Sequence, residues 1–128
     1  MTLVVDASAV GAVVFEEPEG ATIRAHIRDE TLIAPQLIDY ELANVAVKKI
    51  RRNLEPAPVV LAMMTRIEDL AIRRVAVPAA DVVELAGRTG LSAYDAAYLW
   101  LAHSQDVELV TLDARLAHTD RLLRGDPA

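Results

Sequence analysis

The sequence predicts an α/β protein in which a parallel β-sheet of four to five strands lies between two layers of helices. Two observations carry this prediction. Short apolar runs alternate along the chain with longer segments whose apolar residues have helical spacing. The connections between these segments are short, and the sequence contains no internal repeat. Strands that are separated by helices form parallel sheets with helices on both faces.

Four segments are predicted to form the strands of this sheet. The first strand is predicted from its run of β-branched residues. Prolines mark the ends of the second and third strands, because Pro35 begins a turn and Pro78 ends the third apolar run. The predicted strands span residues 2–5, 31–34, 72–77 and 108–111.

The predicted helices follow from apolar spacing and from stop signals. The longest has Ile38, Leu42 and Ala46 on one stripe. Pro18 stops the first helix, because proline disfavours helix in the residue before it, and Gly87 or Gly90 stops a later one. The predicted helices span 8–15, 19–28, 37–52, 56–70, 81–87 and 92–104, followed by two short helical turns at 113–117 and 119–124 and a frayed tail at 125–128.

The composition indicates a single domain with an aliphatic core. The chain has 128 residues, of which 53% are hydrophobic, with one Trp, one Phe and three Tyr. The absence of cysteine excludes disulfides and thiolate metal sites and favours a reducing, cytoplasmic compartment. No signal-peptide pattern stands at the amino terminus, and no apolar run approaches the ~20 residues of a membrane helix. We therefore expect a cytoplasmic protein that does not contact a membrane.

Two of the predicted strands run into an aspartate. Asp6 follows the first strand, and Asp113 follows the fourth. Carboxyl ends of parallel strands lie at one edge of a sheet, where such folds bind their ligands. Two carboxylates there repel each other unless a proton or a divalent cation neutralises them. Each aspartate can also be explained as the N-cap of the helix that follows it.

The middle of the chain offers two further acidic candidates. Glu41 lies beside the apolar stripe of its helix and can point towards the sheet edge, although a solvated position is the commoner explanation for a lone helix glutamate. Asn44, one turn further on, is a candidate hydrogen-bond partner for it. Asp95 closes a capping box that begins at Ser92, and it also lies at the positive end of the helix dipole, which favours its ionised form.

Polar residues next to these acids are candidates for supporting roles. Thr111 precedes Asp113 by two positions, so both side chains face the same side, and the hydroxyl can orient a carboxylate or hold a water. Arg115 closely follows Asp113, and because of this position it is the candidate for contacting a phosphate. Another basic group is explained as a solvated face at a helix carboxyl end: Lys48, Lys49, Arg51 and Arg52.

The net charge limits the class of partner. Thirteen basic and nineteen acidic residues leave a formal charge of −6, which argues against a sequence-independent nucleic-acid binder. The same balance suits a nuclease that concentrates its acids around metal ions.

Four short motifs, in this order and spacing, resemble those of the PIN-domain nucleases and, within them, of the VapC toxins. The resemblance covers nearly the whole chain. Its motifs are Val4-Val5-Asp6-Ala7-Ser8, Glu41 with Asn44, Ser92-Ala93-Tyr94-Asp95-Ala96-Ala97-Tyr98-Leu99, and Leu109-Val110-Thr111-Leu112-Asp113-Ala114-Arg115-Leu116.

The resemblance implies a PIN-like three-layer α/β/α domain over residues 1–124 and a metal-dependent endoribonuclease. Asp6, Glu41, Asp95 and Asp113 correspond to the family's acidic quartet, and Ser8 and Thr111 match its supporting hydroxyls. The cofactor implied is Mg²⁺ or Mn²⁺, which prefers oxygen ligands. The partners implied are an RNA substrate, a VapB-like antitoxin and a second copy of the chain. PIN domains often end in a further strand, which is not evident here.

Two other functions compete with this interpretation. Phosphoaspartyl phosphatases and receivers rely on a late lysine, yet no lysine follows Lys49. Asp6-Ala7-Ser8 also lacks the phosphatase's second aspartate. A non-catalytic PIN-like interaction module is the remaining alternative, and it has no physical reason to keep four mutually repelling carboxylates together.

Overall fold

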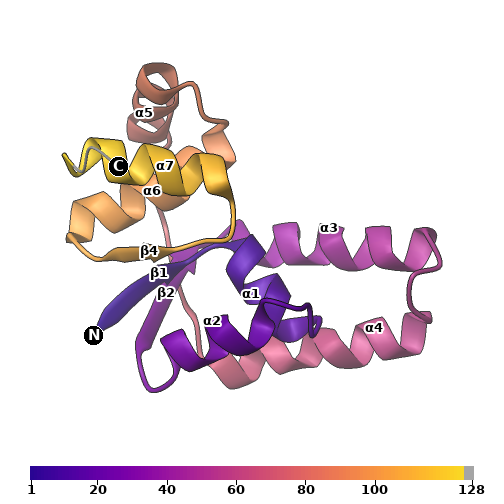
Figure 1. The fold of residues 1–128 in the computed structure, drawn as a ribbon. Coiled ribbons are helices and arrows are strands. Elements are labelled where there is room, and N and C mark those ends of the chain that lie inside the picture. Colours follow the sequence, from indigo (N-terminus) through magenta and orange to yellow (C-terminus); the bar gives the residue numbers. More distant parts are fainter. Residues whose placement is uncertain (126–128) are drawn as a thin grey trace.

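A computed structural model describes residues 1–125 and has a four-stranded, all-parallel sheet at its centre (Figure 1). The strand order is β3-β2-β1-β4, so the first strand is internal and the last lies at an edge. The strands are β1 (Thr2–Val5), β2 (Thr31–Pro35), β3 (Arg73–Val75) and β4 (Glu108–Val110). The α/β class and the parallel sheet are therefore confirmed, and within residues 1–125 the sheet has no fifth strand.

The two edge strands are shorter than the sequence predicts. β3 and β4 each have three residues, whereas the apolar runs extend over 72–77 and 108–111. Each pairs with one neighbour only, which reduces the number of ladder hydrogen bonds that hold its ends. β1 lies between β2 and β4, and its Val4 and Val5 are fully buried.

Seven α-helices and one 3₁₀ helix occupy the described part of the chain. Most agree with the predicted segments to within two residues. The helices are α1 (Ala7–Val14), α2 (Gly20–Ile27), α3 (Ile38–Arg51), α4 (Ala57–Met64), the 3₁₀ helix η1 (Thr65–Leu70), α5 (Ala79–Thr89), α6 (Ala93–Gln105) and α7 (Ala114–Leu123).

Two predicted helix assignments are wrong, and of the two glycines predicted to stop helix α5 only Gly90 does so. The segment 56–70 divides into α4 and η1, which ends at Ala71 in the left-handed region. Helix α5 continues through Gly87 and ends at Gly90, whose φ of 76° favours glycine. The two short turns predicted after residue 113 are a single helix, α7, within which the Thr119 hydroxyl donates to the Arg115 carbonyl. Of the predicted tail, residues 126–128 lie outside the described residues.

The helices cover both faces of the sheet (Figure 1). Helix α6 packs on β1, β2 and β4, with α5 and α7 beside it. On the other side α1 packs against α2 and α3, while α3 and α4 form a long hairpin that extends past the sheet (Figure 1). This is the three-layer α/β/α arrangement that the sequence predicts.

The core is aliphatic, as the composition predicts, apart from the aromatic side chains of Phe15 and Tyr98. Tyr98 on α6 is the largest fully buried side chain. Asp6 is the buried charged residue among those described, with 5% of its surface exposed. No helix within residues 1–125 is long and apolar enough to cross a membrane.

Candidate active site at the carboxyl edge of the sheet

The carboxylate of Asp6 is held by donors from two separate parts of the chain. Asp6 directly follows β1 and caps α1, because its Oδ1 accepts from the Ala9 amide at 3.0 Å. The same oxygen accepts from the Ser8 hydroxyl at 2.7 Å, and Oδ2 accepts from the Thr111 hydroxyl at 2.5 Å. The capping explanation is therefore correct, but it accounts for only one of three hydrogen bonds. A carboxylate has about four lone-pair positions, so Oδ2 retains one.

The Ser8 and Thr111 hydroxyls join the end of β1 to the loop before α7. The Ser8 and Thr111 oxygens lie 3.3 Å apart. Ser8 Oγ accepts from the Leu112 amide at 2.9 Å, and Thr111 Oγ1 accepts from the Asp113 amide at 3.0 Å. These bonds link two strand ends that are more than a hundred residues apart in sequence.

Asp113 caps the helix that follows it. Its Oδ1 accepts from the Leu116 amide at 3.0 Å, the hydrogen bond expected of an N-cap. Its Oδ2 accepts no hydrogen bond from the residues that the structure describes.

Glu41 lies in the first turn of α3 and is bonded to a residue other than the one predicted. Its Oε1 accepts from the Tyr98 hydroxyl at 2.5 Å. Asn44 is exposed and, within residues 1–125, makes no hydrogen bond to Glu41, so the predicted pairing is wrong. The sequence signal that could have pointed to Tyr98 is the spacing on α6, because Tyr98 follows Asp95 by three positions and therefore lies on the same helix face.

Asp95 is in the first turn of α6, where Ser92 serves as the cap. The Ser92 hydroxyl accepts from the Asp95 amide at 3.1 Å. The return bond of a capping box, from the Ser92 amide to the Asp95 carboxylate, is not formed in the described residues. The carboxylate of Asp95 is therefore available to a ligand.

The acids of the quartet influence one another electrostatically. Burial, as the largest cause, raises the pKa of Asp6, Glu41 and Asp95. Repulsion adds to it in each case, because Asp113 raises the pKa of Asp6, and Asp6 raises that of both Glu41 and Asp95. The structure thus brings the four predicted acids together at one edge of the sheet, although they come from four separate segments.

Arg115 is the positive charge that acts on this cluster. Its guanidinium donates to the Gly90 carbonyl at 2.6 Å, which joins the start of α7 to the loop before α6. The same charge lowers the pKa of Asp95, although burial and the neighbouring carboxylates outweigh it. Within residues 1–125, no member of the acidic quartet forms an ion pair.

The quartet fits a hard divalent cation in its chemistry. Its free oxygens are carboxylate oxygens, which suit Mg²⁺ and Mn²⁺ better than zinc. Burial is the largest cause that raises the pKa values of Asp6 and Asp95, and a bound cation would relieve the mutual repulsion that adds to it. Among the described residues, however, no three His, Asp or Glu side chains are already arranged to hold a metal ion. The donor types fit, while the side chains are not gathered into ligating positions.

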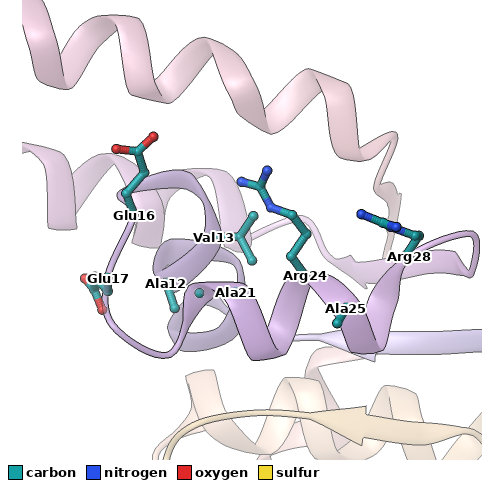
Figure 2. Close-up of a pocket in the computed structure, with 9 residues that line it drawn as sticks. Ala12, Val13, Glu16, Glu17, Ala21, Arg24, Ala25 and Arg28 are labelled. Atoms are coloured by element: carbon teal, nitrogen blue, oxygen red, sulfur yellow. The ribbon is translucent and has the colours of Figure 1, made fainter.

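A separate hollow lies along α1 and α2 (Figure 2). This cavity has a volume of about 550 Å³, and its polar lining comes from Glu16, Glu17, Arg24 and Arg28. Glu16 is paired with Arg66, so part of this lining is already neutralised. No member of the acidic quartet lines the cavity, and it is not the candidate active site.

Comparison with known proteins agrees with this fold. Residues 3–122 match the family model described as PIN domain. The chain is 36% identical to ribonuclease VapC3 of Pyrobaculum aerophilum, with 91% of this chain and 93% of that protein covered. It is 37% identical to ribonuclease VapC9 of Mycobacterium tuberculosis, covering 91% and 90%. The crystal structure of PAE2754 from Pyrobaculum aerophilum superposes with a TM-score of 0.76 at 25% identity, covering 93% of this chain and 79% of that one.

A four-stranded parallel sheet with acids at its carboxyl edge, together with a match over almost the full chain, defines the class: the chain belongs to the PIN-domain family. Within that family it is of the VapC type, as the identities to VapC3 and VapC9 show.

Proposed function

We propose that this protein is a Mg²⁺- or Mn²⁺-dependent endoribonuclease and the toxin of a type II toxin–antitoxin pair. One observation carries the proposal. Four carboxylates from four segments meet at the carboxyl edge of the sheet, and burial together with repulsion raises the pKa of Asp6, Glu41 and Asp95. None of the four forms an ion pair in residues 1–125. Uncompensated repulsion costs stability, so such a cluster is expected where a cation is used. The names of the relatives, which are ribonucleases, support the same activity.

In this proposal the acidic quartet is the catalytic centre. Asp6 and Asp95 are the main metal ligands, and Glu41 and Asp113 complete the site. A bound Mg²⁺ or Mn²⁺ supplies a Lewis acid that neutralises phosphate charge and lowers the pKa of water. Ser8 and Thr111 keep the Asp6 carboxylate in one orientation, which removes the cost of ordering it during the reaction.

Arg115 is the proposed contact for the RNA phosphate. The guanidinium is exposed, and it is anchored by the Gly90 carbonyl close enough to Asp95 to lower its pKa. A phosphate bound there would lie beside the quartet. Arginine presents several donors in a plane and binds phosphate oxygens in pairs.

A toxin of this type implies a VapB-like antitoxin, a second copy of the chain and a cytoplasmic location. The relatives' VapC names support the antitoxin, and the absence of cysteine is in keeping with a reducing compartment. Co-expression tests the partnership: the chain alone should arrest bacterial growth, and the product of a neighbouring gene should relieve the arrest and co-purify. Growth unaffected by the chain would contradict the toxin role. Sedimentation of the purified chain then tests the dimer, because a monomer at micromolar concentration would contradict it.

The activity is tested with purified protein and a mixed RNA substrate. Cleavage should require added Mg²⁺ or Mn²⁺, and a chelator should stop it. Asp6→Asn and Asp95→Asn should each be inactive while unfolding at no lower temperature than the parent, because each removes a repelling charge. Asp106→Asn is the matched control, since this aspartate is exposed at the far end of α6 in the left-handed region that asparagine tolerates. Activity retained in both quartet variants would show that a different site is responsible.

A further inference from the structure

We infer that Tyr98 is a positioning residue whose hydroxyl holds Glu41 in place and leaves the second carboxylate oxygen of Glu41 free for the divalent cation. The inference rests on the proposed function, because it assigns Tyr98 a task only through Glu41. The PIN-type motif on this helix includes Tyr98, but the resemblance assigns a role only to Asp95 there.

The contact between the two side chains is short and isolated. The Tyr98 hydroxyl donates to Glu41 Oε1 at 2.5 Å across 57 positions of sequence. Tyr98 is only 1% exposed, so its hydroxyl has no access to bulk water and needs a protein partner. Glu41 is the one hydrogen-bond partner of this hydroxyl among the described residues.

The elements that carry the pair explain why this bond can hold Glu41. Helix α6 packs on three of the four strands, so the Tyr98 ring is fixed by the core. Glu41, by contrast, is half-buried in the first turn of α3 and has three rotatable side-chain bonds. A rigid donor therefore orders a flexible acceptor.

Asp95 and Tyr98 lie on the same face of α6, one turn apart. One helix thus presents a member of the quartet and also holds a second member that belongs to α3. Burial is the largest cause that raises the pKa of Glu41, the Tyr98 hydrogen bond acts in the opposite direction, and repulsion from Asp6 and Asp95 nearby adds to the increase. A donor that favours the ionised form is what a metal-binding carboxylate needs.

The experiment is a double-mutant cycle on the full chain, read out by Mn²⁺ binding without RNA. Free Mn²⁺ is followed by electron paramagnetic resonance, and RNA cleavage is measured in parallel. Tyr98→Phe keeps the ring and removes only the hydroxyl, and it should weaken Mn²⁺ binding about tenfold. In a Glu41→Gln background the same change should have no further effect, because the pair acts as a unit. Tyr94→Phe, which alters an exposed tyrosine on the same helix, is the matched control and should bind Mn²⁺ like the parent.

A second variant guards against a loss of folding in Tyr98→Phe. Glu41→Asp keeps the carboxylate charge at a half-exposed position. The aspartate side chain is one methylene shorter and cannot reach the Tyr98 hydroxyl from the same backbone position, so this variant should weaken Mn²⁺ binding to a similar extent. Unchanged binding and cleavage in both variants, with an active parent, would overturn the inference alone. An equal loss for Tyr98→Phe in the Glu41→Gln background would also overturn it, since Tyr98 would then act by another route. A parent that neither binds Mn²⁺ nor cleaves RNA would overturn the proposed function itself.

Discussion

The two halves of the acidic quartet are held in different ways. Asp6 and Asp113 stand at the ends of β1 and β4, where hydroxyls and backbone amides bond to their carboxylates. Glu41 and Asp95 stand in the first turns of α3 and α6, and a single phenol is the one donor to their carboxylates in the described residues. We call these the strand half and the helix half.

The difference suggests a division of labour in binding a cation. The strand half is ordered before any ligand arrives, because its bonds come mainly from residues within three positions or from the loop beside it. In the helix half only Glu41 is held, by the Tyr98 hydroxyl, and no described residue donates to the Asp95 carboxylate. This agrees with the absence, in residues 1–125, of a ready-made group of three ligands. Asp95 is therefore the carboxylate that we expect to be ordered by the cation itself.

The largest expected effect comes from removing a carboxylate from either half. Asp6→Ala and Asp95→Ala should both reduce RNA cleavage at least a hundredfold, on the order of effects seen for groups that act on the reacting phosphate. Their stabilities should differ. Asp6→Ala should be less stable than Asp6→Asn by about 1 kcal/mol, because alanine cannot cap α1. Asp95→Ala and Asp95→Asn should be equally stable, since Ser92 caps α6. Denaturant unfolding measures these stabilities. If Ala were less stable than Asn by the same amount at both positions, the distinction between the strand half and the helix half would be contradicted.

The next effect should come from the hydroxyls of the strand half. Thr111→Val removes the hydroxyl that donates to Asp6 and accepts from the Asp113 amide. It should weaken both Mn²⁺ binding and cleavage by about tenfold. It should also lower the free energy of unfolding by about 1 kcal/mol. Thr119→Val is the control, because that hydroxyl bonds only within α7. A variant that binds Mn²⁺ as tightly as the parent would show that the strand half needs no hydroxyl support.

The metal-free protein should lose stability as the pH rises. Asp6, Glu41 and Asp95 all have pKa values raised above their ordinary values of 3.8, 4.5 and 3.8 in the folded state. The folded protein therefore binds more protons than the unfolded chain, and the free energy of unfolding falls as the pH climbs from those values through the raised ones. Thermal unfolding in chelator should show this decline from about pH 4 upwards. The decline should be smaller in Asp6→Asn and in Glu41→Gln, and a slope unchanged in both would contradict the assignment.

The smallest expected effect comes from substituting Arg115, whose charge acts on Asp95 of the helix half. Arg115→Gln should raise KM for RNA about two- to fivefold and leave kcat nearly unchanged, since an exposed ionic contact contributes little free energy. The variant's KM should also depend less on salt concentration. Arg121→Gln, on the exposed part of α7, is the control. An equal change in kcat would show instead that Arg115 acts on the reacting phosphate.

Much of the fold and the composition of the candidate site were predictable from local patterns. Apolar alternation and helical stripes specify strands and helices, because each depends on residues a few positions apart. Cap residues mark helix starts, and for that reason Asp6, Ser92 and Asp113 were all placed at the beginnings of helices, where the structure has them. The errors were also local. A threonine at position 119 that bonds within α7 was interpreted as the start of another helical turn.

The sequence by itself determined the order of the elements and the four acids that stand where elements begin or end. Only the tertiary structure decided which side chains meet, including the Thr111 hydroxyl on Asp6 and the Tyr98 hydroxyl on Glu41. These pairs are separated by 105 and 57 positions, so no local period relates them. The strand order β3-β2-β1-β4 and the packing of α6 on the sheet bring them together, because burying the apolar faces of the sheet and of α6 fixes where each strand end and each first helical turn must lie.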